Sequence, residues 1–338
     1  MLSRYHAVLS STQIQRWLVG SVAVTLLVLS AGTVSAESYS GNQWIEMMAE
    51  SGEMLNYSGR FVVSRNGEMS TLKISHMGSD MGGVQKLSSV DGQMREIVSS
   101  KDAVSCLLPD LNMGVKEARQ STVDQYFPMN FNGNMTLLND NYIIELQSMA
   151  RIADRDCQAL AVKPKDQLRY GYVFCIDVEN FLLLSSDLIN EQGSVLESYR
   201  FVEIAFDKVQ EQSLMPEVKS EELNWMDDAG TPHSNAGMET SNWVMKTNES
   251  NFVINHSLTR YSPALDSQIH HIILTDGLAN VSAFVVPENS SSGDAVKDIS
   301  MGALNANTKM VGGYKLTVLG EVPKSTVRLI ANSMEIQP

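Results

Sequence analysis

The sequence predicts an α+β protein with two antiparallel sheets, a large one with an N-terminal helix and a smaller one with a C-terminal helix. Four apolar runs between residues 157 and 206 are separated by only a few turn residues each, which is typical of successive β-hairpins. Asn-Gly and Asp-Gly pairs separate further alternating runs on the N-terminal side, and such pairs are strong hairpin signals. A polar segment at 210–240 precedes a second group of strand-like runs, so two domains are expected.

The stretch 151–206 is predicted to form a continuous meander with strands at 157–163, 169–177, 181–190 and 195–206. Its last two loops, 178–180 and 191–193, fit three-residue hairpin connections that need a positive φ at their final position. Asn180 and Gly193 occupy those positions, and Asn and Gly tolerate a positive φ best. Pro164 is expected to end the first strand because it has no N–H to donate to the sheet.

Placing Asp166 at the tip of the first hairpin pairs Leu160 with Tyr172 and Cys157 with Cys175. One face then carries large apolar side chains and the other carries small ones, although an antiparallel sheet usually has one solvated face. Such a sheet is expected to curve around something apolar, either a helix of the protein or a bound lipid-like molecule; burial in an ordinary core is the commoner outcome. The large face carries Leu160, Val162, Tyr170, Tyr172, Phe174, Ile176, Leu182, Leu184 and Leu188.

The first domain is predicted to span 37–209 and to begin with an amphipathic helix at 42–55. Trp44, Ile45 and Met48 recur at helical spacing, and Ser40 is available as the N-cap. This helix could plug the concave side of the sheet. Strands are expected at 57–64, 69–77, 85–90, 94–99 and 103–108, and a short helix near 121–131 could cover the concave face.

The second domain is predicted to span 241–338 after a linker at 210–240, within which Trp225 could dock on one domain. Asp276-Gly277 and Gly312-Gly313 are expected to turn between strands. A terminal helix at 323–333 is expected to turn Val327, Leu329 and Ile330 inward. The strands are expected at 252–261, 270–276, 279–286 and 310–319.

The first 36 residues are predicted to be a signal peptide. Arg4 and Arg16 precede an uncharged run at 17–30, and Val34-Ser35-Ala36 supplies small residues for cleavage after Ala36. Export of the mature chain is therefore expected. Removing the leader leaves 23 basic and 39 acidic residues, a net charge of −16. This acidity argues against nucleic acid and is compatible with a partner that has basic patches.

Three cysteines occur, at positions 106, 157 and 175. In an oxidising compartment, the opposed hairpin positions make Cys157 and Cys175 the disulfide candidate and leave Cys106 over. Three reduced, buried cysteines that act as small apolar residues are the alternative.

No constellation of residues predicts catalysis, a metal site or a cofactor. His270 and His271 are adjacent on a predicted strand, so their side chains point to opposite faces and do not chelate one ion together. The other histidines are scattered, and no nucleophile motif or phosphate-binding glycine loop occurs. A binding or interaction protein is therefore favoured over an enzyme.

Several runs, spread over nearly the whole mature chain, carry a family resemblance. They include Arg151-Ile-Ala-Asp-Arg-Asp-Cys157, Pro164-Lys-Asp166 and Arg169-Tyr-Gly-Tyr172 in the first domain, and Leu274-Thr-Asp-Gly-Leu278 and Leu319-Gly-Glu-Val-Pro323 in the second. On these runs the chain resembles the RseB/MucB family of periplasmic regulators of the envelope-stress sigma factor of the sigma-E/AlgU type. Cys175 stands where an aromatic residue is expected in relatives, which adds weight to the disulfide.

The resemblance implies a function. Such proteins bind the periplasmic part of a membrane-spanning anti-sigma factor and shield it from the site-one protease. Their larger domain resembles the lipoprotein carriers LolA and LolB, half-open barrels around an apolar cavity, and their smaller domain contributes most to holding the anti-sigma factor. Lipopolysaccharide or another lipid signal is expected to release the complex.

On this hypothesis, the large domain reads an amphiphile through Tyr170, Tyr172, Phe174, Leu182 and Leu184. The small domain holds the anti-sigma partner through Asp276, Gly277, Leu278, Val281, Phe284 and Val285. The alternative is a periplasmic lipoprotein or lipid carrier on the same half-barrel, for which the small domain would be dispensable. The sequence leaves open the identity of the amphiphile and whether the chain forms a homo-oligomer.

Overall fold

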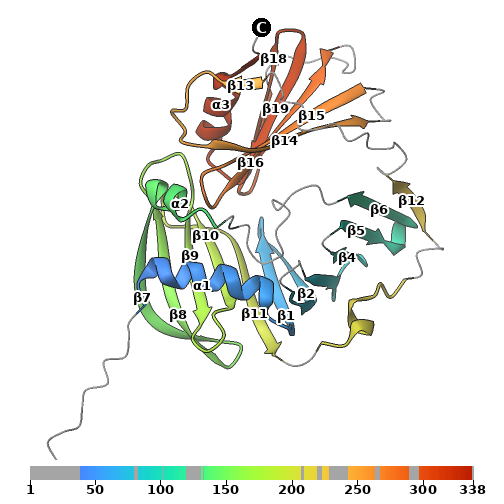
Figure 1. Cartoon of the computed structure of the whole chain (residues 1–338), viewed down its shortest axis with the longest axis vertical. Helices are drawn as coiled ribbons and strands as arrows, with labels where there is room; N and C mark the ends of the chain where they lie inside the picture. Colours follow the sequence, from blue (N-terminus) through green and yellow to red (C-terminus); the bar gives the residue numbers. More distant parts are fainter. Residues whose placement is uncertain are drawn as a thin grey trace, which may run out of the picture. The chain divides into compact units, whose positions relative to one another are not determined.

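Figure 1 shows the computed structural model of the chain. It describes residues 39–79, 83–100, 102–118, 131, 133–206, 209–218, 223–227, 243–262, 267–288 and 297–336. The predicted signal peptide and, apart from Phe131, the predicted helix at 121–131 lie outside these residues. None of the helices in the described ranges has the length and apolar character needed to cross a bilayer. The chain from Ser40 onward forms one compact unit.

The first element is helix α1 (Gly41–Met54), which confirms the helix predicted at 42–55. Ser40 caps it reciprocally with Gln43: the Gln43 N–H donates to the Ser40 hydroxyl, and the Ser40 N–H donates to the Gln43 side chain. Trp44, Ile45 and Met48 are buried in the same core as the strands of the large sheet. The helix therefore packs on the sheet as the predicted plug (Figure 1).

The large sheet has twelve strands in the order β12-β6-β5-β4-β3-β2-β1-β11-β10-β9-β8-β7. All neighbours are antiparallel except β6 and β12, which are parallel. The strands are β1 (Tyr57–Arg65), β2 (Glu68–Met77), β3 (Val84–Ser89), β4 (Glu96–Ser99), β5 (Ala103–Leu108), β6 (Met113–Ala118), β7 (Tyr142–Ile152), β8 (Arg155–Pro164), β9 (Gly171–Asp177), β10 (Leu183–Ile189), β11 (Val195–Ala205) and β12 (Asn224–Asp227). Helix α2 (Met135–Asn141) and the 3-10 turns η2 (Pro109–Leu111) and η3 (Glu211–Leu214) connect some of them.

The turns follow their predicted chemistry with one exception. Asn66 and Gly67 have φ of 57° and 80° between β1 and β2, and Gly193 has φ of 78° between β10 and β11. In the β9–β10 turn the positive φ lies on Phe181, at 57°, and not on Asn180, so that prediction is wrong. The Asp177 carboxylate accepts hydrogen bonds from the backbone N–H groups of Glu179 and Asn180, which moves the positive-φ position one residue on.

The predicted register of the β8–β9 hairpin is wrong by two residues. Leu160 faces Phe174, and Tyr172 faces Val162. The connection spans residues 165–170, so its midpoint lies beyond Asp166. Asp166 accepts hydrogen bonds from the Leu168 N–H and from the Arg169 guanidinium, which gives this loop a structure of its own.

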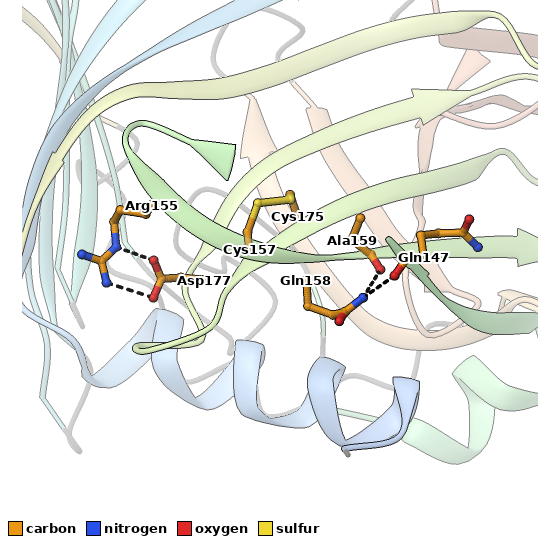
Figure 2. The surroundings of a disulfide bond; sticks show 7 residues. All are labelled: Gln147, Arg155, Cys157, Gln158, Ala159, Cys175 and Asp177. Carbon is orange, nitrogen blue, oxygen red and sulfur yellow. Dashed lines mark hydrogen bonds and ion pairs between the residues drawn. A yellow bond between two sulfur atoms is a disulfide. The ribbon is translucent and has the colours of Figure 1, made fainter. Parts of the chain in front are cut away.

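Cys157 and Cys175 form a disulfide, although they are not directly opposite each other (Figure 2). Cys157 pairs with Asp177 and Cys175 pairs with Ala159, so the bridge runs diagonally between β8 and β9. Alternate residues of a strand point to one face, and the Cα–Cα distance of 5.4 Å is usual for a disulfide. The two cysteines point away from the side of β8 that carries Gln158 (Figure 2). Cys106 is free.

Some elements were not predicted. Strands β6 and β7 and helix α2 lie in a region without a predicted regular period. Strand β12 and turn η3 lie within the segment predicted as a linker. Trp225 of β12 packs over Gly114 of β6, where a Cβ atom would lie 2.8 Å from the indole ring. The end of the large sheet is therefore built by residues beyond position 209.

The small sheet has six strands in the order β14-β15-β16-β19-β18-β17. Helix α3 (Lys324–Ser333) confirms the predicted terminal helix, with Val327 and Ile330 buried as expected and Leu329 half-buried. The strands are β14 (Val253–Ser262), β15 (Ser267–Thr275), β16 (Asn280–Pro287), β17 (Lys297–Met301), β18 (Leu304–Val311) and β19 (Tyr314–Gly320), and β13 (Trp243–Met245) pairs with β20 (Met334–Ile336). Two antiparallel sheets, each with its own buried core, confirm the predicted α+β class.

Candidate functional site

A cavity of about 440 Å³ lies between strands of the large sheet and strands of the small sheet. This volume is within the range of small-molecule sites, about 300–1,000 Å³. Its large-sheet wall consists of Val63, Arg65, Tyr172, Phe174, Ser186, Leu188, Glu197, Ser198 and Tyr199. Its small-sheet wall consists of Leu278, Ala279, Asn280, Ser282, Leu304, Leu319, Gly320 and Glu321.

Two of the five residues predicted to bind an amphiphile line this cavity. Tyr172 and Phe174 project from β9 with ring centroids 5.4 Å apart. Leu182 and Leu184 are buried in the core of the large sheet instead. Tyr170 lies outside the lining, with its hydroxyl 3.3 Å from the Asn305 amide nitrogen. The structure thus brings only part of the predicted set together.

One cationic and two anionic side chains line the cavity. The Arg65 guanidinium lies 2.7 Å from Glu197 of its own sheet and 3.1 Å from Glu321 of the small sheet. Burial raises the pKa of the Glu321 carboxyl above its usual range, Glu197 adds to this shift, and Arg65 opposes it. Two carboxylates that share one guanidinium leave this part of the lining with a net negative charge.

A second set of contacts between the sheets centres on Arg169, whose side chain is completely buried. Its Nη1 lies 3.1 Å from Oδ2 of Asp276, its Nη2 donates to the Ser250 carbonyl at 2.8 Å, and the guanidinium also pairs with Asp166. The rings of Tyr142 and Phe252 lie 5.8 and 5.4 Å from the guanidinium carbon. Two carboxylates, a backbone carbonyl and two aromatic rings therefore compensate this buried cation.

Asp276, at the end of β15, is equally buried. Its carboxylate accepts hydrogen bonds from the Tyr142 hydroxyl at 2.9 Å and from the backbone N–H groups of Leu278 and Ala279 at 3.0 and 2.8 Å, besides the Arg169 contact. Burial raises the pKa of the Asp276 carboxyl above its usual value, and Arg169 and the three other donors oppose this shift without cancelling it. The four donors together stabilise the ionised form.

Further polar and close contacts surround this ion pair. The Asn141 amide donates to the Asp276 carbonyl at 2.8 Å, and Asn251 donates to Asn141 at 2.7 Å. Gly277 has φ of 102°, and a Cβ atom there would lie 2.6 Å from the Leu138 nitrogen. We call these contacts the junction. Its residues are Tyr142, Arg169 and Asp276 together with Leu138, Asn141, Asn251 and Gly277.

The six residues predicted to contact a partner are mostly buried within the chain. Asp276 and Gly277 belong to the junction, and Leu278 lines the cavity. Val281 and Val285 are fully buried in the core of the small sheet. Phe284 is half-buried, with its ring stacked on His271 at 4.2 Å. The structure therefore places this segment in core and inter-sheet contacts, with Phe284 the most accessible of the six.

The role of Arg169 was missed in the sequence, although this residue is part of the run that carries the family resemblance. One local signal exists: Asp166 and Arg169 stand three residues apart in a loop between two apolar strands. The pairing with Asp276, 107 residues away, has no local signal. Within the described ranges, no three His, Cys, Asp or Glu side chains gather in a way that could hold a metal ion.

The chain is similar to known proteins along most of its length. The family model of the MucB/RseB N-terminal domain matches residues 40–222, and that of the MucB/RseB C-terminal domain matches residues 237–335. The sigma factor AlgU regulatory protein MucB of Pseudomonas aeruginosa is 28% identical over 319 residues, which cover 92% of this chain and 96% of that protein. The sigma-E factor regulatory protein RseB of Escherichia coli is 26% identical over 323 residues, which cover 95% and 98% of the two chains.

Solved structures agree with these matches. A chain of the solved MucA/MucB complex of Pseudomonas aeruginosa is 26% identical, with a TM-score of 0.67 and coverage of 88% of this chain and 99% of that one. A crystal structure of MucB alone gives 25% identity and a TM-score of 0.64. Both relatives named above are sigma factor regulatory proteins. Because the two family models match residues 40–222 and 237–335, well over half of the chain, this protein belongs to the MucB/RseB family.

Proposed function

We propose that this protein is a periplasmic regulator that binds the periplasmic part of a membrane-spanning anti-sigma factor and shields it from site-one proteolysis. The observation that carries the proposal is the match of both domains to MucB, a relative solved in complex with MucA.

We further propose that the leader is removed after Ala36 and that the mature chain works in the periplasm. The disulfide between Cys157 and Cys175 supports an oxidising compartment. Mass spectrometry of the protein recovered from the periplasm is expected to give Glu37 as the first residue. An intact leader would contradict this part of the proposal.

Capture of the partner is the main test. The mature chain, residues 37–338, is incubated with the immobilised periplasmic segment of the anti-sigma factor from the same organism, and site-one protease is then added. We expect retention of the mature chain and slower cleavage of the segment. A Phe284→Ser variant probes the accessible part of the predicted partner segment and is expected to bind more weakly. Absence of binding by the intact mature chain would contradict the proposal.

Release by an amphiphile is tested separately. We propose that the acyl part of such a ligand occupies the apolar part of the cavity, near Tyr172, Phe174 and Leu188. Lipopolysaccharide added to the preformed complex is expected to free the segment, and a Leu188→Asp variant is expected to resist this release. Capture that is unchanged at all lipopolysaccharide concentrations would reject release and leave partner binding standing.

A further inference from the structure

The junction joins the two sheets through charges that have no access to water. Arg169 and Asp276 are both completely buried, and the remaining donors and acceptors around them are supplied by both sheets. Separating the sheets would leave each charge to be solvated anew or to stay buried without its partner. Breaking a buried pair is strongly unfavourable, so the junction favours one arrangement of the two sheets.

The junction is also part of the cavity wall. Asp276 accepts hydrogen bonds from the N–H groups of Leu278 and Ala279, and the side chains of these two residues line the cavity. Across the cavity, Tyr172 stands three residues after Arg169 on the same hairpin. The Arg169–Asp276 contact thus lies close in the chain to residues of both walls.

We propose that the Arg169–Asp276 pair is a latch that fixes the two sheets in one arrangement, and that the anti-sigma segment binds this latched arrangement. Binding of the segment to the latched arrangement rests on the proposed function, whereas the latch itself does not. Arg169 and Asp276 act here as positioning residues, because both are completely buried and do not themselves contact the anti-sigma segment. A partner that contacts both sheets binds only molecules whose sheets have the arrangement found in the complex. Its affinity therefore falls when a smaller fraction of the free molecules has that arrangement.

The test uses the intact mature chain with Asp276→Asn. This substitution removes the charge and keeps an oxygen that can accept from Leu278 and Ala279. Small-angle scattering is expected to give a larger radius of gyration than for the unchanged protein, and affinity for the immobilised segment is expected to fall at least tenfold. Glu203→Gln, which removes the exposed contact of Glu203 with Arg60 outside the cavity, is the control, with both quantities unchanged.

A second control separates positioning from stability. Replacing both cysteines, Cys157→Ala with Cys175→Ala, destabilises the large sheet without touching the junction. All variants are measured well below their melting temperatures, and the cysteine variant is expected to keep the affinity and the radius of gyration of the unchanged protein. If Asp276→Asn prevents folding, Arg169→Gln, which removes the other charge of the pair, is used; changes of both quantities in the same direction are expected.

An unchanged radius of gyration for the junction variant would overturn the latch. A larger radius with unchanged affinity would overturn its role in partner binding, as would an equal loss of affinity in the cysteine variant. If the unchanged protein does not bind the segment, the proposed function fails. The comparison of radii of gyration still decides whether the Arg169–Asp276 pair fixes the two sheets.

Discussion

Two arginine–carboxylate contacts join the same two sheets at the same distance, yet in different surroundings. Arg169 and Asp276 lie 3.1 Å apart with both side chains 0% exposed. Arg65 and Glu321 also lie 3.1 Å apart, with side chains 56% and 43% exposed. Water screens the second pair and solvates its charges when the contact is lost. The charges of the first pair have no such access to water while they stay buried. Burial, and not distance, therefore decides which contact holds the sheets together.

The partners of the two arginines differ in the same way. Arg169 also contacts Asp166 and the Ser250 carbonyl, so its guanidinium is held from several sides. Arg65 has a second partner, Glu197, on its own sheet, so it keeps an ion pair when the small sheet moves away. Loss of Glu321 costs Arg65 little, because Glu197 remains.

The largest expected effect is that of Asp276→Ala. The change leaves Arg169 buried with only the partly exposed Asp166 as counter-ion, so the free energy of unfolding is expected to fall by about 3–5 kcal/mol. Urea denaturation followed by circular dichroism measures this, with Glu321→Ala as the control. A loss equal to that of the control would contradict the comparison.

Removal of the disulfide tests a link that lies within one sheet. Closing a loop with a sequence separation of 18 is worth about 3 kcal/mol, so Cys157→Ala with Cys175→Ala is expected to lower the unfolding free energy by that amount. The contact between the sheets should stay intact, because neither cysteine takes part in it. Expansion of the folded variant in small-angle scattering would show that the large sheet and the junction are not independent.

Tyr142→Phe removes one hydrogen bond to Asp276 and keeps the ring beside Arg169. A hydrogen bond to a charged group contributes about 1.5–3 kcal/mol, and the loss of unfolding free energy is expected to lie near the lower value because three other donors remain. Urea denaturation beside a Tyr170→Phe control, whose hydroxyl makes a longer contact to Asn305, measures the difference. Equal losses of unfolding free energy would mean that the Tyr142 hydroxyl contributes no more to stability than the Tyr170 hydroxyl does.

The smallest effect is expected for Glu321→Gln, because Arg65 keeps its contact with Glu197. Exposed ion pairs contribute about 0–1 kcal/mol and are screened by salt, so a loss of about 0.5 kcal/mol or less is expected at low ionic strength. Raising the salt concentration should remove the difference between the variant and the unchanged protein. A loss that persists in 1 M salt, where screening extends over about 3 Å, would place this pair in the same class as the buried one.

Local chemistry in the sequence predicted much of the fold. The Ser40 cap, the Asn66-Gly67 turn and helix α3 follow from neighbouring residues and were found where expected. Strand β7 was missed because its register shifts between Leu146 and Met149, which breaks the period of two that marks a strand.

Errors of register and site came from interactions between distant residues. The β8–β9 pairing was misplaced because the loop at 165–170 is ordered around Asp166 and Arg169, and Arg169 in turn pairs with the other sheet. Asp276 was expected on a partner surface because the family resemblance assigns partner binding to the small domain. Its burial depends on an arginine more than one hundred residues away, which a single sequence does not reveal.

A pair of double-mutant cycles tests the central claim most directly. Unfolding free energies are measured for Arg169→Met, Asp276→Asn and their combination, and for Arg65→Met, Glu321→Gln and their combination. The coupling energy is expected to be about 2–3 kcal/mol for the buried pair and below about 0.5 kcal/mol for the exposed one. Equal coupling energies in the two cycles would contradict the claim that burial makes Arg169 and Asp276 the contact that fixes the two sheets.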